Sequence, residues 1–144
     1  MSRLVAIAIA ACLPALLAGP AAAATPNAHA RKLLTRCENA VDTVPIVPLK
    51  AHSPQVPKAN RRARAAFHRC SATKAWNRLT VSYAKNKAVQ DAFHAWLGLA
   101  TGIGDYLTYC HNVAFGVTGK NVFHQAHFEI RRARRAAKQA RAEL

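Results

Sequence analysis

The stretch 89–117 constrains the fold of this chain more than any other part of it. It contains no lysine or arginine, although the chain as a whole carries 21 basic and 6 acidic residues. Polar side chains interrupt it at Asp91, His94, Asp105 and His111, which is too often for a segment in contact with lipid. We therefore expect a central helical layer that neighbouring helices cover. The residues expected to be buried in it are Phe93, Trp96, Leu97, Ile103, Leu107 and Cys110.

Residues 1–24 have the features of a secretory signal. Arg3 supplies a positive charge, the uncharged run that follows is apolar, and an Ala-x-Ala pattern ending at Ala24 matches a cleavage site. The mature chain would begin at Thr25 and would be secreted, periplasmic or held in the cell envelope. Two alternatives stay open: an uncleaved anchor, and a lipidated N-terminus at Cys12, which ends a sequence that resembles a lipobox.

Apolar periodicity predicts one all-α domain over residues 25–144, folded as a small bundle of about four helices. The expected helices span residues 27–44, 58–97, 105–115 and 119–143. A connector at 45–57 separates the first two, because its four prolines remove backbone donors and disfavour helix. Gly98, Gly102 and Gly104 favour a turn or a kink after the second helix. The alternative is that these small residues let a helix approach its partner closely.

Three cysteines follow the predicted signal. Cys37 precedes the connector and Cys70 follows it, so a disulfide between them would tie the first helix to the second. Closing a loop of about 33 residues stabilises a fold by roughly 4 kcal/mol in the chain-entropy model. Cys110 is left over, either as a buried thiol, as a bond to a second chain or as a metal ligand.

A second hypothesis uses the histidines. His124 and His127 lie three residues apart on one side of an expected helix, and Cys110 and His111 lie on the element before it. Imidazole and thiolate are ligands for zinc and copper, so these four residues are a candidate metal set. Their spacing is not diagnostic, and the chain has no C-x-x-C-H motif for covalently bound haem. A metal- or haem-binding carrier is therefore the alternative function.

Catalysis has less support in the sequence. The chain contains no G-x-S-x-G, no H-E-x-x-H and no phosphate-binding glycine loop. Its acidic residues are scattered, and no pair of them shares one apolar helix face. We therefore expect a binding protein more than an enzyme.

The segment 119–144 has the clearest amphipathic pattern in the chain. Its apolar positions alternate at three and four residues, form a narrow seam and are mostly alanine. They are Phe123, Ala126, Ile130, Ala133, Ala137, Ala140 and Leu144. The positions between them carry a dense group of cations. These cations are Arg131, Arg132, Arg134, Arg135, Lys138 and Arg141.

The formal net charge of +15 favours an anionic partner. We expect a non-enzymatic exported protein that binds an anionic envelope polymer, a nucleic acid or an anionic lipid surface. The cations of the segment 119–144 are the candidate anion-binding residues. The alternative interpretation is a surface kept charged for solubility alone.

Overall fold

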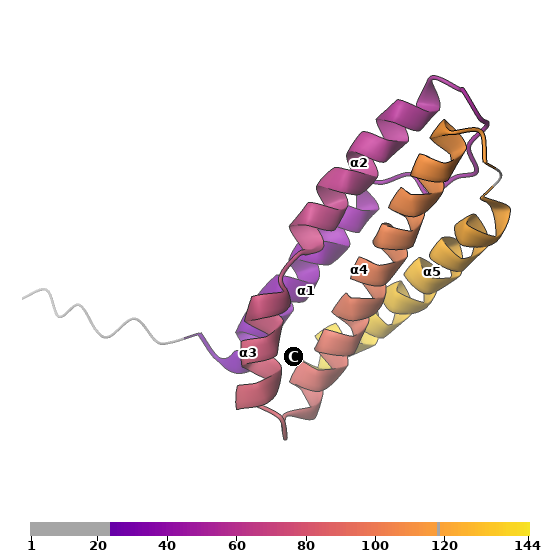
Figure 1. Ribbon diagram of the computed structural model, residues 1–144. Helices are drawn as coiled ribbons and strands as arrows, with labels where there is room; N and C mark the ends of the chain where they lie inside the picture. Colours follow the sequence, from indigo (N-terminus) through magenta and orange to yellow (C-terminus); the bar gives the residue numbers. More distant parts are fainter. Residues whose placement is uncertain (1–23, 118) are drawn as a thin grey trace, which may run out of the picture.

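A computed structural model describes residues 24–117 and 119–144 of the chain, and these residues form helices and no strands. The helices are α1 (Pro26–Asp42), α2 (Gln55–Cys70), α3 (Thr73–Ser82), α4 (Lys87–Ala114) and α5 (Lys120–Glu143). In Figure 1, α2 and α3 lie end to end, so the helices pack as four rods. The predicted small all-α bundle is confirmed. The predicted signal, apart from Ala24, lies outside the described residues.

The expected single helix over residues 58–97 is wrong, because the chain breaks twice within it. The first break follows Cys70, whose carbonyl accepts a hydrogen bond from the indole N–H of Trp96 at 2.8 Å instead of continuing a helix. The second break precedes α4, where the Asn86 side chain accepts from the Val89 backbone N–H at 3.2 Å. This cap satisfies one of the donors that a new helix leaves open. In the part of the chain that is described, none of the helices is long and apolar enough to cross a bilayer.

The predicted turn at Gly98, Gly102 and Gly104 is also wrong, since α4 runs through all three positions. The alternative, close approach to a partner helix, is what the structure shows. A β-carbon at Gly98 would lie 3.0 Å from the β-carbon of Ala133, and one at Gly102 would lie 2.6 Å from Cγ1 of Ile130. Two of the three glycines therefore let α4 approach α5 closely, and the predicted helix at 105–115 is only the second half of α4.

Most of the expected central layer is buried. Trp96, Ile103 and Cys110 are buried, and Phe93 and Leu107 are half-buried against the core. Leu97 is 45% exposed, so its predicted burial is wrong. The physical reason is that Trp96 and Leu99 take the core-facing positions of this turn of α4. The seam of α5 is buried as expected from Phe123 to Ala140.

Two tyrosines of α4 hold the connector between α1 and α2. The Tyr106 hydroxyl donates to the Pro45 carbonyl at 2.9 Å, and the Tyr109 hydroxyl accepts from the Leu49 backbone N–H at 2.6 Å. An extended segment rich in proline cannot satisfy its own backbone groups, so these hydroxyls replace the missing partners. Burial raises the pKa of Tyr106, which keeps the hydroxyl protonated as a donor.

The predicted disulfide is confirmed. Cys37 of α1 and Cys70 of α2 are bonded, with their α-carbons 4.5 Å apart. Cys110 is a free thiol buried within α4. The bond fixes the C-terminal half of α1 against the C-terminal end of α2.

Candidate anion-binding site

The six candidate cations of α5 are all exposed, but they are not equivalent. The Arg134 guanidinium donates to the Asp42 carboxylate of α1 at 2.7 Å, and Nε of Arg141 lies 3.4 Å from the Glu38 carboxylate. These two arginines are therefore partly neutralised by α1. The other four have no ion-pair partner within the described residues. They are Arg131, Arg132, Arg135 and Lys138.

Glu38 shows how closely α5 lies against α1 on this side. Its side chain is only 11% exposed. Burial raises the pKa of the Glu38 carboxyl, and the nearby Arg141 guanidinium opposes that rise. A second ion-pair group, in which Lys87 contacts Asp91 and Glu143, joins the start of α4 to the end of α5. The acidic residues that form ion pairs thus lie along α5 and its neighbours.

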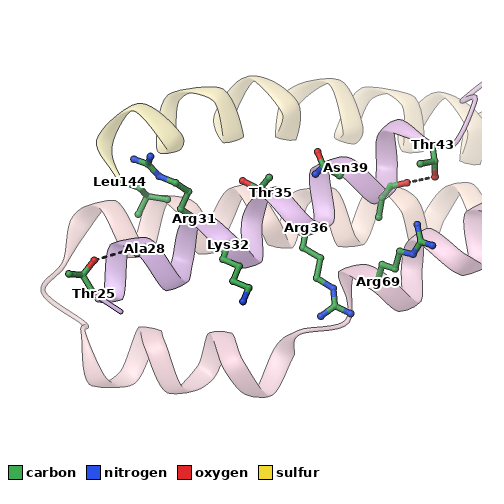
Figure 2. Close-up of a pocket in the computed structure, with 11 residues that line it drawn as sticks. Thr25, Ala28, Arg31, Lys32, Thr35, Arg36, Asn39, Thr43, Arg69 and Leu144 are labelled. Carbon is green, nitrogen blue, oxygen red and sulfur yellow. Dashed lines mark hydrogen bonds between the residues drawn. The ribbon is translucent and has the colours of Figure 1, made fainter. Parts of the chain in front are cut away.

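The outer face of α1 carries a groove whose charged side chains are all cationic. Arg31, Lys32 and Arg36 of α1 and Arg69 of α2 line it, and no acidic residue is among the described residues of its wall. The groove is open to solvent and has a volume of about 1040 Å³. Figure 2 shows the four cationic side chains spread along the outer side of α1.

The periodicity of α1 accounts for this lining. Ala30, Leu34 and Cys37 are fully buried, so the residues between them point outward. In Figure 2, Arg31 points toward the end of α5, whereas Lys32 and Arg36 point toward the rod of α2 and α3. The Arg31 guanidinium donates to the Arg141 carbonyl at 3.5 Å, so one cation of the groove is tied to the C-terminal end of α5.

The rod formed by α2 and α3 extends this positive surface. Residues 43–90 contain no aspartate or glutamate. Every lysine and arginine of α2 and α3 is exposed, and none of them forms an ion pair within the described residues. These are Lys58, Arg61, Arg62, Arg64, Arg69, Lys74 and Arg78. We call these residues, together with Lys32 and Arg36, the acid-free face.

Sequence reasoning singled out the cations of the last helix and did not consider the acid-free face. The sequence does contain a signal for this face, because residues 43–90 have no aspartate or glutamate. What the sequence did not show is that Arg36 and Arg69, far apart along the chain, line one groove.

The structure does not bring the candidate metal set together. Cys110 is buried, and burial raises the pKa of its thiol to about 11, so it stays protonated. The His111 ring packs against Phe115, the residue that follows α4, and the rings of His124 and His127 pack against Phe123. Within residues 24–117 and 119–144, no group of three or more metal-binding side chains is close enough to hold an ion.

Comparison with known proteins gives no relative for this chain. No protein-family model, no curated protein and no solved structure matches it. Its function is therefore inferred from the charge and the geometry of its own residues.

Proposed function

We propose that this protein is a non-enzymatic binding protein for an anionic polymer and that the acid-free face is the principal contact surface. The observation that carries the proposal is the groove on α1, where Lys32, Arg36 and Arg69 of the acid-free face are exposed and no aspartate or glutamate lines the described wall. Unpaired surface cations attract polyanions and gain affinity by releasing the counterions that the polymer holds.

The extent of the acid-free face favours a polymer over a small anion. The 16 residues of α2 and the 10 residues of α3 together span roughly 40 Å at about 1.5 Å per residue. Cations recur along that whole length, starting at Lys58 and ending at Arg78. A single small anion would meet only one or two of them, whereas a chain with repeated charges would meet most.

The four unpaired cations of α5 provide a second, weaker contact area in this proposal. Arg131, Arg132, Arg135 and Lys138 share their helix with Glu129 and Glu143, so the local charge is partly balanced.

The disulfide and the predicted signal support an exported protein, because disulfides persist in oxidising compartments. The polymer that we propose is accordingly a phosphate- or sulfate-bearing polymer of the cell envelope. Nucleic acids and anionic lipid surfaces are the other sources of repeated negative charge, and the experiment that follows separates them.

The proposal is tested by titrating the full mature chain with four probes at several salt concentrations. The probes are fluorescent poly(glycerol phosphate), heparin, duplex DNA and vesicles of phosphatidylglycerol. We expect poly(glycerol phosphate) and heparin, which carry repeated phosphate and sulfate groups, to bind tightest. Their affinity should fall steeply between about 50 and 200 mM salt. Neutral dextran is the control and should not bind. Equal binding of dextran, or no binding of any polymer at about 50 mM salt, would contradict the proposal, and tighter binding of DNA or vesicles would reassign the partner.

A further inference from the structure

An apolar pocket lies at the end of the bundle where the connector between α1 and α2 meets the loop between α4 and α5 (Figure 1). It is partly open to solvent and has a volume of about 400 Å³. Its walls come from the connector, α4, the loop and α5. Among the apolar side chains that line it are Pro48, Leu49, Val113, Val117 and Phe123. The pocket shares no residue with the groove on α1 or with the acid-free face.

Tyr109 of α4 holds two walls of this pocket in place. Its hydroxyl accepts a hydrogen bond from the Leu49 backbone N–H at 2.6 Å and donates one to the Leu49 carbonyl at 3.3 Å. Gly119 of the loop lies so close to the ring that a β-carbon there would be 2.8 Å from Cδ2 of Tyr109. The connector and the loop therefore both pack against one ring, and the pocket is built into the fold.

Apolar surface at the pocket remains in contact with water. Val117 lines the pocket and is 57% exposed, and Phe115, two residues earlier, is 73% exposed. An apolar ligand in the pocket would cover part of this surface, and the hydrophobic effect would drive its binding.

Two basic side chains, Lys120 and His124, also line the pocket. They lie four residues apart on α5, so they share one face of that helix. Both are exposed, and Lys120 forms no ion pair within the described residues. The described walls come from residues 43–90 and 106–128, which contain no aspartate or glutamate. An anionic group beside Lys120 would therefore meet positive charge and no opposing carboxylate.

We propose that this pocket binds a single-chain amphiphile, which is one alkyl chain that ends in an anionic head group. The chain would lie against the apolar walls, and Lys120 and His124 would bind the head group. Ligand sites commonly combine apolar walls with a few polar groups that fix the orientation of the ligand. This activity goes beyond polymer binding and uses different residues.

The test is calorimetric titration of the full mature chain with decanoate, below the concentration at which decanoate forms micelles. Octanoate and dodecanoate measure the contribution of chain length, and decylammonium reverses the charge of the head group. We expect binding to strengthen about two- to threefold with each added methylene, which is less than full burial would give, because the pocket is partly open. Decylammonium should bind at least about tenfold more weakly than decanoate.

Two matched pairs of variants separate the pocket from the rest of the surface. Val117→Asp should weaken decanoate binding at least about tenfold, because it places a negative charge in an apolar wall. Val81→Asp makes the same change at an exposed position of α3 outside the pocket and should have no effect. Lys120→Gln should weaken binding about three- to fivefold, whereas Lys138→Gln, on the same helix and outside the pocket, should change it little. All four side chains are exposed, so we expect the fold to survive, and circular dichroism checks this.

Equal losses for Val117→Asp and Val81→Asp, or decylammonium binding as tight as that of decanoate, would overturn the proposed pocket ligand. Absence of decanoate binding by the wild type would also overturn it, and binding of poly(glycerol phosphate) would then stand as a separate result. Binding of phosphatidylcholine vesicles in place of decanoate, lost in Val117→Asp, would assign this end of the bundle to a lipid surface and overturn the proposal as well. Decanoate binding without polymer binding would contradict the polymer proposal alone.

Discussion

The pair α4–α5 and the pair α1–α2 are held together by different means. α4 and α5 lie side by side along much of their length (Figure 1), and small residues such as Gly98 and Ala133 let them approach closely. α1 and α2 are joined by a disulfide. The buried face of α2 consists of Val56, three alanines and Cys70, so it removes little apolar area from water.

The distribution of charge follows the same division. α5 pairs two of its arginines with α1 and places Glu143 near Lys87 of α4. α2 has exposed cations and no acidic residue. The exposed cations of α2 repel one another, and its buried face removes little apolar area from water. Packing alone is therefore a weak means of holding α2 in place. We infer that the disulfide supplies the stability that allows α2 to expose uncompensated positive charge.

Loss of the disulfide should have the largest effect on the free energy of unfolding, and it tests whether the bond rather than packing holds α2. The variant Cys37→Ala with Cys70→Ala should lose roughly 4 kcal/mol of unfolding free energy, because a long loop is no longer closed in the unfolded state. Urea unfolding followed by circular dichroism measures the loss. Cys110→Ala is the control, because it removes a buried thiol and keeps the bond. A loss below about 1 kcal/mol in the double variant would mean that packing alone holds α2.

A smaller effect tests the other pair. Gly102→Ala should lower the unfolding free energy by about 1–3 kcal/mol, because the new methyl would lie 2.6 Å from Cγ1 of Ile130 on α5. Gly104→Ala is matched to it: the same helix gains a methyl, which would lie 3.3 Å from the ring edge of Phe67. That ring is 39% exposed and can move. Equal losses in the two variants would contradict close packing at Gly102.

The smallest of the three stability effects concerns Glu38, at the edge between the two pairs. Burial raises the pKa of its carboxyl above the ordinary value of 4.5, so the folded state disfavours the ionised form. The stability of the wild type relative to Glu38→Gln should therefore be highest below pH 4.5 and fall as pH rises through the raised pKa.

Thermal unfolding at a series of pH values measures this difference. Asp42→Asn, which removes a more exposed carboxylate on the same helix, is the control. A relative stability that rises with pH would mean that the pairing of Glu38 with Arg141 outweighs burial.

The pattern of residues within one segment predicted those features of the fold that depend on that segment alone. The seam of α5 and the extent of α1 followed from apolar spacing, and the disulfide followed from cysteines on either side of a connector. The glycines of α4 were misread as a turn, because glycine favours both turns and close helix contacts, and only the partner residues Ala133 and Ile130 decide between them. The end of α2 depends on Trp96, which is 26 positions away.

The same limit applies to the site. Arg134 looked as available as its neighbours, because Asp42, its partner, lies 92 positions earlier in the chain. The groove on α1 combines residues of α1, α2 and the C-terminus, so no single segment contains it. The absence of acidic residues from 43–90 was visible in the sequence, but its meaning depends on α2 and α3 exposing their cations together.

The most direct test of this account compares two variants that lose the same charge. One replaces Arg61, Arg62, Arg64 and Arg69 of α2 with glutamine, and the other replaces Arg131, Arg132, Arg135 and Lys138 of α5. The measurement is the affinity of each for poly(glycerol phosphate) as a function of salt. We predict that the α2 variant binds at least about tenfold more weakly than the α5 variant at roughly 0.15 M salt and shows the shallower salt dependence. Equal losses, or a larger loss in the α5 variant, would contradict the acid-free face as the principal contact surface.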